Sequence, residues 1–130
     1  MLEDEGYQLM GAAFEVYNVV GYGLAEEVYQ QCLERELSLR GIPFDSKRSL
    51  RMFYKGDPIE RLYVPDLFVF DAIVVELKAT RELLPEHEAQ LLNYLQISKK
   101  RVGYLVNFGA REAVEWKRFI RSSTGHVPVD

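Results

Sequence analysis

Apolar side chains recur every three or four residues in three stretches of the chain, which is the spacing of an amphipathic helix. The predicted helices cover residues 4–20, 24–40 and 85–98. Glycines separate the first two helices, and Gly41 and Pro43 end the second. Pro85 suits the first turn of the third helix, because the amide hydrogen that proline lacks has no partner at that position.

A second pattern, in which runs of apolar and aromatic residues are bounded by turn residues, predicts strands. The predicted strands cover residues 44–54, 59–70, 72–79, 101–108 and 112–121. Residues 122–130 are expected to lack regular structure. The resulting order, α-α-β-β-β-α-β-β, predicts an α/β fold with a mixed β-sheet flanked by helices. At this length, residues 1–130 are expected to form a single domain.

Three charged residues interrupt the most apolar part of this pattern. Asp66 stands in the second predicted strand, and Glu76 and Lys78 stand in the third, whose other residues indicate a central strand covered on both faces. Because Glu76 and Lys78 are two residues apart, their side chains point to the same face. Pro65 cannot donate to a sheet ladder, which predicts a bend that aims the Asp66 carboxylate.

The turn between these two strands sets the partner of Asp66. With a turn at residues 70–72, position 69 pairs with position 73, and Asp66 lies opposite Glu76. Like charges at opposite positions of a sheet repel each other, whereas a divalent cation between two carboxylates attracts both. The residues alone therefore predict a metal site at Asp66 and Glu76, with the amine of Lys78 beside it.

Composition restricts the setting of such a site. The hydrophobic content of 48% suffices for a core, and no apolar run is long enough to span a bilayer. The start of the chain is acidic, unlike a signal peptide. A single cysteine, Cys32, excludes an internal disulfide and fits a reducing compartment. We therefore expect a cytoplasmic protein that does not engage a membrane.

Charge is distributed unevenly along the chain. The net charge of −4 argues against a protein that coats nucleic acid, yet residues 1–34 hold seven acids and none of the 16 basic residues. The basic residues gather in three clusters: Lys47, Arg48, Arg51 and Lys55; Lys99, Lys100 and Arg101; and Arg111, Lys117, Arg118 and Arg121. These clusters are either contacts for phosphates or solvated turns and strand edges, and the sequence leaves both open.

Side chains on two of the predicted helices could complete the site. On a helical wheel for residues 24–40, Glu26 falls at the edge of the apolar arc and Glu27 on the polar side. Glu26 is either an acid paired with an arginine or a third carboxylate near the metal. Gln90 and Tyr94 are four residues apart and share one helix face, where both can donate and accept hydrogen bonds.

Together these residues resemble the PD-(D/E)XK nuclease superfamily, and further short motifs narrow the resemblance to the small bacterial and archaeal "GxxExxY" family. The motifs are Gly23-x-x-Glu26-x-x-Tyr29, Pro65-Asp66 with Glu76-Leu77-Lys78, Gln90-x-x-x-Tyr94 as in RecB-type members, and Asn107-Phe108-Gly109. They follow one another in the expected order, and the resemblance covers about residues 5–120, nearly the whole chain.

The resemblance implies a restriction-endonuclease-like fold and metal-dependent hydrolysis of phosphodiester bonds in nucleic acid, with DNA favoured over RNA. It implies that Mg²⁺ or Mn²⁺ is bound by Asp66, Glu76 and the backbone carbonyl of Leu77. Glu26 would assist as a ligand or through a water molecule. The ion would lower the pKa of a bound water and polarise a phosphoryl oxygen.

The resemblance also gives roles to the remaining motif residues. Lys78 would position the attacking water and stabilise the charged transition state, or, in a purely structural role, neutralise the two acids. Gln90 and Tyr94 would orient these groups or contact the nucleic acid, or simply belong to an ordinary amphipathic helix. Tyr29 is expected to pack in the core with its hydroxyl bonded near the site.

Two other classes of function stay open. One is a nucleic-acid-binding module of the same fold that hydrolyses little or nothing, which the acidic N-terminal third and the small size favour. The other is a protein-interaction domain, because exposed aromatic residues such as Tyr7, Tyr22 and Trp116 could form a contact surface. A homodimer is compatible with all three hypotheses.

Overall fold

The computed structural model describes residues 1–122 and 125–129. In this part of the chain, three helices and eight strands follow one another: α1 (Glu3–Val20), α2 (Glu26–Leu39), β1 (Phe44–Ser46), β2 (Leu50–Tyr54), β3 (Asp57–Tyr63), β4 (Leu67–Val69), β5 (Ile73–Lys78), α3 (Pro85–Ser98), β6 (Val102–Asn107), β7 (Glu115–Ser122) and β8 (Gly125–Val129). The predicted mixed α/β fold and the order of its helical and strand regions are confirmed. Two of the predicted strands are each divided, and one strand is added.

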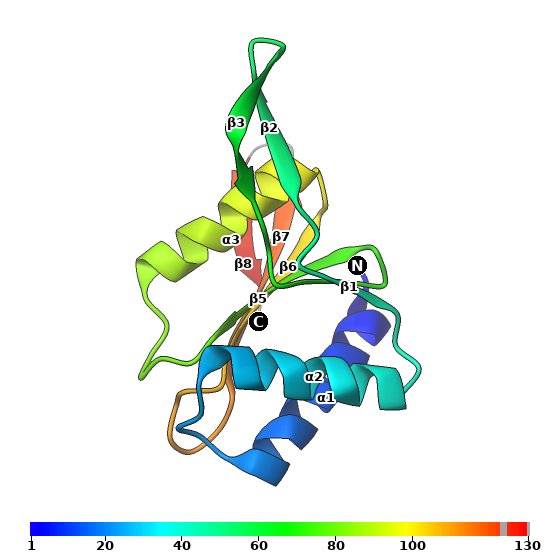
Figure 1. Cartoon of the computed structure of the whole chain (residues 1–130), viewed down its shortest axis with the longest axis vertical. Coiled ribbons are helices and arrows are strands. Elements are labelled where there is room, and N and C mark those ends of the chain that lie inside the picture. The colour runs from blue at the N-terminus through cyan, green and yellow to red at the C-terminus, as the bar shows by residue number, and fades with distance from the viewer. Residues whose placement is uncertain (123–124, 130) are drawn as a thin grey trace.

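The main sheet has the order β1-β4-β5-β6-β7-β8 among the strands that the structure describes. Its central pair, β5 and β6, is parallel and is joined by the crossover helix α3, whereas all other neighbours are antiparallel. Strands β2 and β3 form a separate two-stranded sheet that extends away from the body of the protein (Figure 1).

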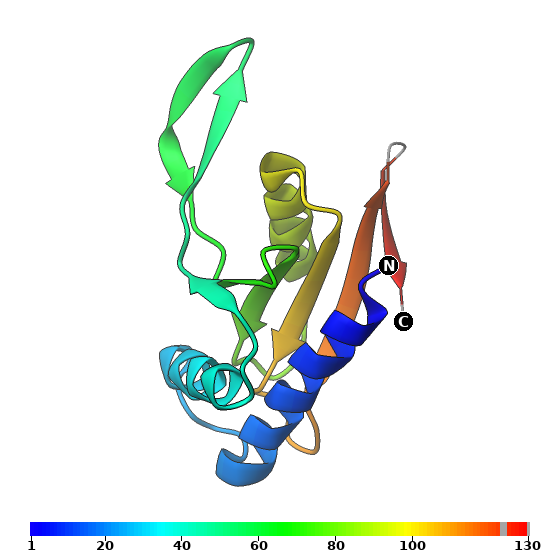
Figure 2. The ribbon, with the colours of Figure 1, turned by 90° about the vertical axis from the view of Figure 1, so that its right-hand side faces the viewer.

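Helices α1 and α2 cover one face of the main sheet, and α3 covers the other (Figure 2). Residues of β5 alternate between these two layers. Val75 packs in the core beneath α1 and α2, whereas Val74 packs with Leu91 of α3. By the same alternation, Glu76 and Lys78 lie on the face that α3 covers.

A tight turn joins β4 to β5 and fixes their register. Phe70 and Asp71 have φ values of 56° and 52°, and the amide of Ala72 donates to the carbonyl of Val69 over 3.1 Å. Two central residues with positive φ match the right-handed twist of the flanking strands. Val69 pairs with Ile73, so the predicted turn and register are confirmed.

The stretch 44–54, predicted as one strand, contains β1 and β2, which belong to different sheets. Lys47 turns the chain between them with a φ of 56°. The stretch 59–70 is likewise divided into β3 and β4, with Pro65 in the segment that separates them. Both predictions joined two short strands into one, although the chain leaves the main sheet between them and returns to it.

The prediction that residues 122–130 lack regular structure is wrong for residues 125–129, which form β8 and pair with β7. Pro128 speaks against a strand in the sequence, but β8 is an edge strand, where a missing amide hydrogen is tolerated. Residues 123, 124 and 130 lie outside the described residues. No helix in the described part of the chain has the length and apolar character that a membrane span needs.

Candidate active site

Asp66 and Glu76 lie together where the chain bends before β4. The amide of Asp66 donates to Oε1 of Glu76 over 3.2 Å, and the amide of Leu77 donates to Oδ2 of Asp66 over 2.8 Å. Both acids are buried, with 6% and 5% of their surface exposed. The structure therefore brings the two predicted carboxylates together, as the register of β4 and β5 requires.

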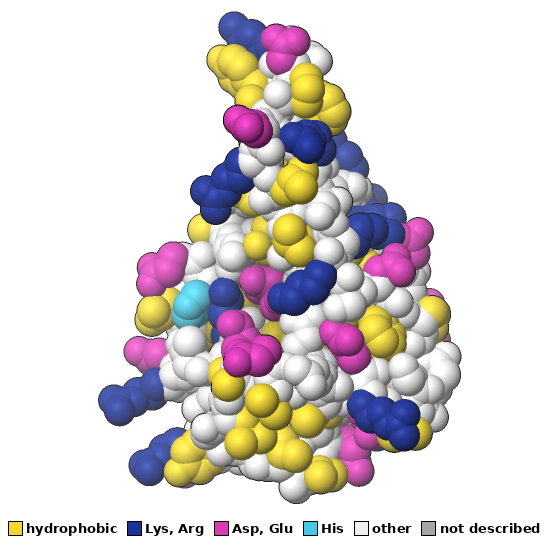
Figure 3. All heavy atoms as spheres, in the orientation of Figure 1, with side chains coloured by type: hydrophobic (Ala, Val, Ile, Leu, Met, Phe, Trp, Pro, Cys, Tyr) yellow, Lys and Arg dark blue, Asp and Glu magenta, His cyan; other side chains and the backbone are white. Residues whose placement is uncertain are grey.

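Each of these carboxylates has its own ammonium group. Nζ of Lys78 lies 3.6 Å from Oε2 of Glu76, and Nζ of Lys47 lies 2.5 Å from Oδ1 of Asp66. Lys78 is largely buried, whereas just over half of the Lys47 side chain is exposed. Acidic and basic side chains gather in the middle of this face, below the β2–β3 hairpin (Figure 3).

Lys47 was not predicted as a site residue. The sequence placed it in a basic cluster, and that cluster was the only signal that could have identified it. The ion pair of Lys47 with Asp66 depends on the left-handed backbone conformation of Lys47. In this conformation the amide of Lys47 donates to the carbonyl of Asp66 over 3.1 Å. Such a conformation is uncommon for a lysine and cannot be predicted from its neighbours.

Helix α3 holds Lys78 through a chain of hydrogen bonds. Nζ of Lys78 donates to Oε1 of Gln90 over 2.8 Å, and Nε2 of Gln90 donates to the hydroxyl of Tyr94 over 3.1 Å. Burial and the charge of Glu76 raise the pKa of Tyr94 to about 12, so its hydroxyl stays protonated. The spacing of four residues thus brings Gln90 and Tyr94 to one side of the lysine.

Glu26 is the first residue of α2 and lies on the rim of a hollow of about 370 Å³ that Lys47 and Asp66 also line. Partial burial and the charge of Asp66 raise the pKa of Glu26, while Lys78 and Lys47 lower it. Glu26 is exposed, whereas Asp66 and Glu76 are buried. No group of three His, Cys, Asp or Glu side chains close enough to hold a metal occurs among the described residues.

Gln30, one turn after Glu26 on α2, was missed by the sequence analysis. Its Nε2 donates to the backbone carbonyl of Asp66 over 2.8 Å and to Oε2 of Glu34 over 3.0 Å. The side chain is buried, with 6% exposed. A glutamine four residues from a predicted site acid on a helix is a signal that could have identified it. Gln30 ties α2 to the bend that presents Asp66.

Tyr29 lies in the core and supports the site from a distance. Its ring stacks on that of Phe108, with the centroids 4.7 Å apart. Its hydroxyl donates to the carbonyl of Gly21 over 2.5 Å and accepts from the amide of Leu24 over 3.3 Å. Tyr29 therefore holds the loop before Glu26, and its hydroxyl bonds the backbone of that loop rather than Asp66 or Glu76.

Burial and the neighbouring charge of Asp66 raise the pKa of Glu76 to about 8, although Lys78 works in the opposite direction. Neighbouring carboxylates repel each other when both are ionised. A divalent cation between Asp66 and Glu76 would remove this repulsion.

Asn107 is the last residue of β6 and pairs with Lys78 at the end of β5. The sequence identified it only as part of the Asn107-Phe108-Gly109 motif. Its Oδ1 accepts from the amides of Thr80 and Gly109, both over 3.0 Å. Its Nδ2 donates to the carbonyl of Thr80 over 2.9 Å and to Oε1 of Glu115 over 3.0 Å. This fully bonded, buried amide fixes the segment that follows Lys78.

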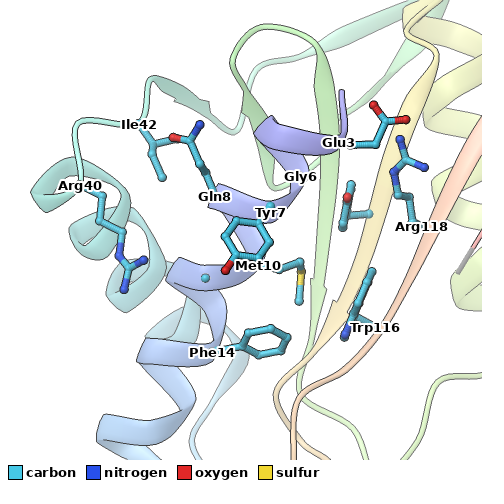
Figure 4. Close-up of a pocket in the computed structure, with 12 residues that line it drawn as sticks. Glu3, Gly6, Tyr7, Gln8, Met10, Phe14, Arg40, Ile42, Trp116 and Arg118 are labelled. Carbon is cyan, nitrogen blue, oxygen red and sulfur yellow. The ribbon is translucent and has the colours of Figure 1, made fainter. Parts of the chain in front are cut away.

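A larger hollow, of about 770 Å³, lies between α1 and strands β6 and β7 (Figure 4). Tyr7, Met10 and Phe14 line it from α1, and Trp116 and Arg118 line it from β7. It contains none of the predicted site residues. Size alone therefore does not locate the site, because Asp66 and Glu26 line the smaller hollow beside α2.

A mixed sheet that presents an Asp on one strand end and a Glu-x-Lys on the next defines a nuclease-like α/β domain. The chain belongs to the PD-(D/E)XK nuclease superfamily, whose family model matches residues 3–119. Nucleases of this superfamily generally use divalent metals and bind nucleic acid.

Comparison with solved structures supports the fold. The chain is similar to the crystal structure of SSO0001, with a TM-score of 0.58 and 19% sequence identity, over 71% of this chain and 48% of that one. At this identity the likeness shows the fold alone, and the chain spans about half the length of SSO0001. None of the curated proteins matches the chain.

Proposed function

We propose that this protein is a divalent-metal-dependent nuclease of the GxxExxY type, with DNA as the favoured substrate and RNA as the alternative. The observation that carries the proposal is the convergence of two buried acids, Asp66 and Glu76, with the Lys78 amine 3.6 Å from the second. Burial and the charge of Asp66 also raise the pKa of Glu76, and a shifted pKa beside a second acid is common at functional sites.

The donor set fits Mg²⁺ or Mn²⁺, which prefer oxygen ligands and keep several waters. Asp66 and Glu76 would supply carboxylate oxygens. The Leu77 carbonyl would supply a third oxygen, because the C=O and N–H of one strand residue point to the same side, and this N–H binds Asp66. Glu26 would contribute directly or through water from the rim of the hollow. When bound, the ion lowers the pKa of a coordinated water and polarises a phosphoryl oxygen.

The other side chains of the site position the Lys78 amine and neutralise negative charge. Gln90 holds the amine of Lys78, and Tyr94 holds Gln90, so the amine is kept at a defined place beside Glu76. From that place Lys78 would orient the attacking water and stabilise negative charge as it develops on the phosphate. Lys47, which pairs with Asp66 in the protein alone, would turn to a phosphate when a cation takes its place.

A calorimetric titration with Mn²⁺ tests the metal site. The wild-type protein is expected to bind the ion, and Asp66→Asn is expected to lose most of the affinity because it removes one of the two anionic ligands. Asp45→Asn is the matched control, since Asp45 is an exposed acid in β1 that does not line the hollow. Equal binding by wild type and Asp66→Asn would refute the site.

A cleavage assay tests the reaction. Wild-type protein with Mg²⁺ or Mn²⁺ is expected to cut single-stranded, duplex or branched DNA, or RNA, and Lys78→Ala is expected to be slower by about 100-fold or more. Binding without cleavage above the Lys78→Ala background would instead support a nucleic-acid-binding module that hydrolyses little or nothing.

One observation favours a protein-interaction role as a second candidate. Tyr7 is 82% exposed on α1 and lines the larger hollow with Trp116, which is 37% exposed (Figure 4). Aromatic surface of this kind is common at protein contacts. Failure to bind any nucleic acid at low salt, where electrostatic attraction is strongest, would favour this candidate over the nuclease.

A further inference from the structure

The hairpin of β2 and β3, residues 50–63 and here called the arm, projects from the body of the protein (Figures 1 and 2). It pairs with no other strand in the described residues. Its turn is short, with Lys55 and Gly56 both at positive φ. A free two-stranded ribbon gains no stability from a third strand, so its surface is available for a partner.

The root of the arm is the candidate active site. The chain leaves the main sheet after β1 and re-enters it at β4, and these two strands are paired neighbours. At this point the amide of Lys47 binds the carbonyl of Asp66, and its amine binds the Asp66 side chain. The ring of Tyr63, at the end of β3, meets Tyr94 of α3 edge-on with the centroids 6.4 Å apart. Any strand held along the arm would therefore lead directly to Asp66.

The outer part of the arm exposes aromatic rings beside cations. Phe53 and Tyr54 are each 60% exposed, and as neighbours in a strand they point to opposite faces. Nζ of Lys55 lies 5.6 Å from the ring centroid of Tyr54, and Cζ of Arg61 lies 5.4 Å from that of Tyr63. Rings interleaved with cations are the usual means by which proteins stack on bases and follow a phosphate chain.

Charge on the arm and its root is opposite to that of the whole chain. Residues 47–63 contain five basic residues and two acidic ones, whereas the net charge of the protein is −4. Two of these basic residues, Lys47 and Arg48, are paired with acids, and the other three lie on the arm itself. This local excess of positive charge favours a polyanion over a neutral or basic partner.

The arm lacks the neutral polar side chains that read base edges. Its residues include no Asn, Gln, His, Ser or Thr, and one guanidinium nitrogen of Arg51 is bound to the carbonyls of Ile59 and Glu60. Contacts through rings and cations alone discriminate little between bases. Base faces are accessible to a ring only where the bases are not stacked in a duplex, so the arm fits unpaired nucleotides.

We propose that the arm binds single-stranded or unpaired nucleic acid and leads that strand to Asp66. Phe53 would stack on a base at one face of the arm and Tyr54 on a base at the other, while Lys55 and Arg61 neutralise phosphates. The inference deepens the proposed nuclease function by naming the substrate class, but the binding itself requires no metal and no hydrolysis. The five residues of β2 span about 17 Å, the axial length of about five stacked nucleotides.

Fluorescence anisotropy with labelled oligonucleotides in EDTA and low salt tests the arm. Phe53→Ala/Tyr54→Ala is expected to weaken single-strand binding about 30-fold or more, since two stacked bases are lost and each contributes about 1–3 kcal/mol. Tyr7→Ala is the matched control, because Tyr7 is equally aromatic and 82% exposed but lies on α1. Lys55→Ala/Arg61→Ala is expected to reduce the salt dependence of binding by about one phosphate contact for each cation lost.

Three outcomes would overturn this proposal. The first is equal single-strand affinity for the arm variants and Tyr7→Ala. The second is arm-dependent binding that prefers a fully paired duplex over a single strand. The third is a concentration-dependent dimer, seen by analytical ultracentrifugation, that the arm variants abolish, because the arm would then bind a second copy of this chain.

The test separates the arm from the metal site. Asp66→Asn is expected to bind single strands in EDTA at least as well as the wild type, since it removes a negative charge near the root of the arm. A wild type that binds single strands through the arm but no Mn²⁺ would overturn the nuclease proposal alone. A wild type that binds Mn²⁺ but shows no arm-dependent binding would overturn the arm proposal alone.

Discussion

Replacing Glu76 by Gln is expected to remove most of the pH dependence of folding stability in the metal-free protein between about pH 5 and pH 8. The substitution keeps the size of the side chain and an oxygen that can accept from the amide of Asp66. It removes the ionisation of a carboxyl group that burial and the charge of Asp66 hold at a raised pKa. The variant therefore isolates the electrostatic penalty of the central pair.

The sign and size follow from the pKa of Glu76, which rises from 4.5 in the unfolded chain to about 8 in the folded protein. Between these values the folded state holds a proton that the unfolded state has released. The free energy of unfolding therefore falls as the pH rises, by at most about 1.4 kcal/mol per pH unit. Over two pH units the wild type is expected to lose up to about 2–3 kcal/mol relative to Glu76→Gln.

Urea unfolding in EDTA at about pH 5.5 and pH 7.5 measures this difference. The other ionisable groups are present in both proteins, so their contributions cancel in the comparison. Glu60→Gln is the matched control, since Glu60 is an exposed acid on the arm. Added Mg²⁺ is expected to stabilise the wild type at the higher pH, and Glu76→Gln much less, because a ligand stabilises only the folded state that binds it.

An equal difference in the free energy of unfolding between wild type and Glu76→Gln at both pH values would refute this prediction. That result would mean that Glu76 keeps one protonation state over this pH range. Burial and the charge of Asp66 would then not raise its pKa as their contact requires. It would also remove the electrostatic reason for placing a cation between Asp66 and Glu76.

Three further changes probe the support of the site. Tyr29→Phe removes two hydrogen bonds to the loop before α2 and is expected to lower the free energy of unfolding by about 1–2 kcal/mol in urea titrations, whereas no change would mean that the loop is held by other contacts. Gly109→Ala would place a Cβ 2.3 Å from the carbonyl oxygen of Thr80 and is expected to cost more than about 2 kcal/mol, and full stability would show that this segment can shift. Lys47→Met removes the ammonium that pairs with Asp66 and is expected to tighten Mn²⁺ binding up to about fivefold by calorimetry, while weaker binding would show that Lys47 helps to assemble the site.

The central pair was predictable because it depends on local rules. Strand alternation placed Glu76 and Lys78 on one face, and a turn at residues 70–72 set the register that brings Asp66 to Glu76. The spacing of Gln90 and Tyr94 likewise placed both beside the lysine. Each of these inferences needs only the period of a strand or helix and the position of one turn.

The parts that the sequence did not predict depend on contacts between distant segments. The ion pair of Lys47 with Asp66 requires the chain to leave and rejoin the main sheet at one point. The sequence does not show this departure, because the residues on both sides of it favour strands. The bond from Gln30 to the carbonyl of Asp66 joins residues 36 positions apart. Strand β8 forms because β7 offers an edge, which overrides the weak strand character of its own sequence.

The departure of the arm gives a structural reason for the proposed metal site at this point of the sheet. Strand β4 pairs with β5 only as far as Val75, so the last part of β5 has no strand on that side. The amide of Leu77 binds the Asp66 side chain instead of a backbone carbonyl, which leaves the Leu77 carbonyl on the same open side. If β4 began three residues earlier, its backbone would bond both the amide and the carbonyl of Leu77. Asp66 would then be an ordinary strand residue. The chain segment that carries the arm away from the sheet is thus the same feature that frees the oxygen atoms for a cation.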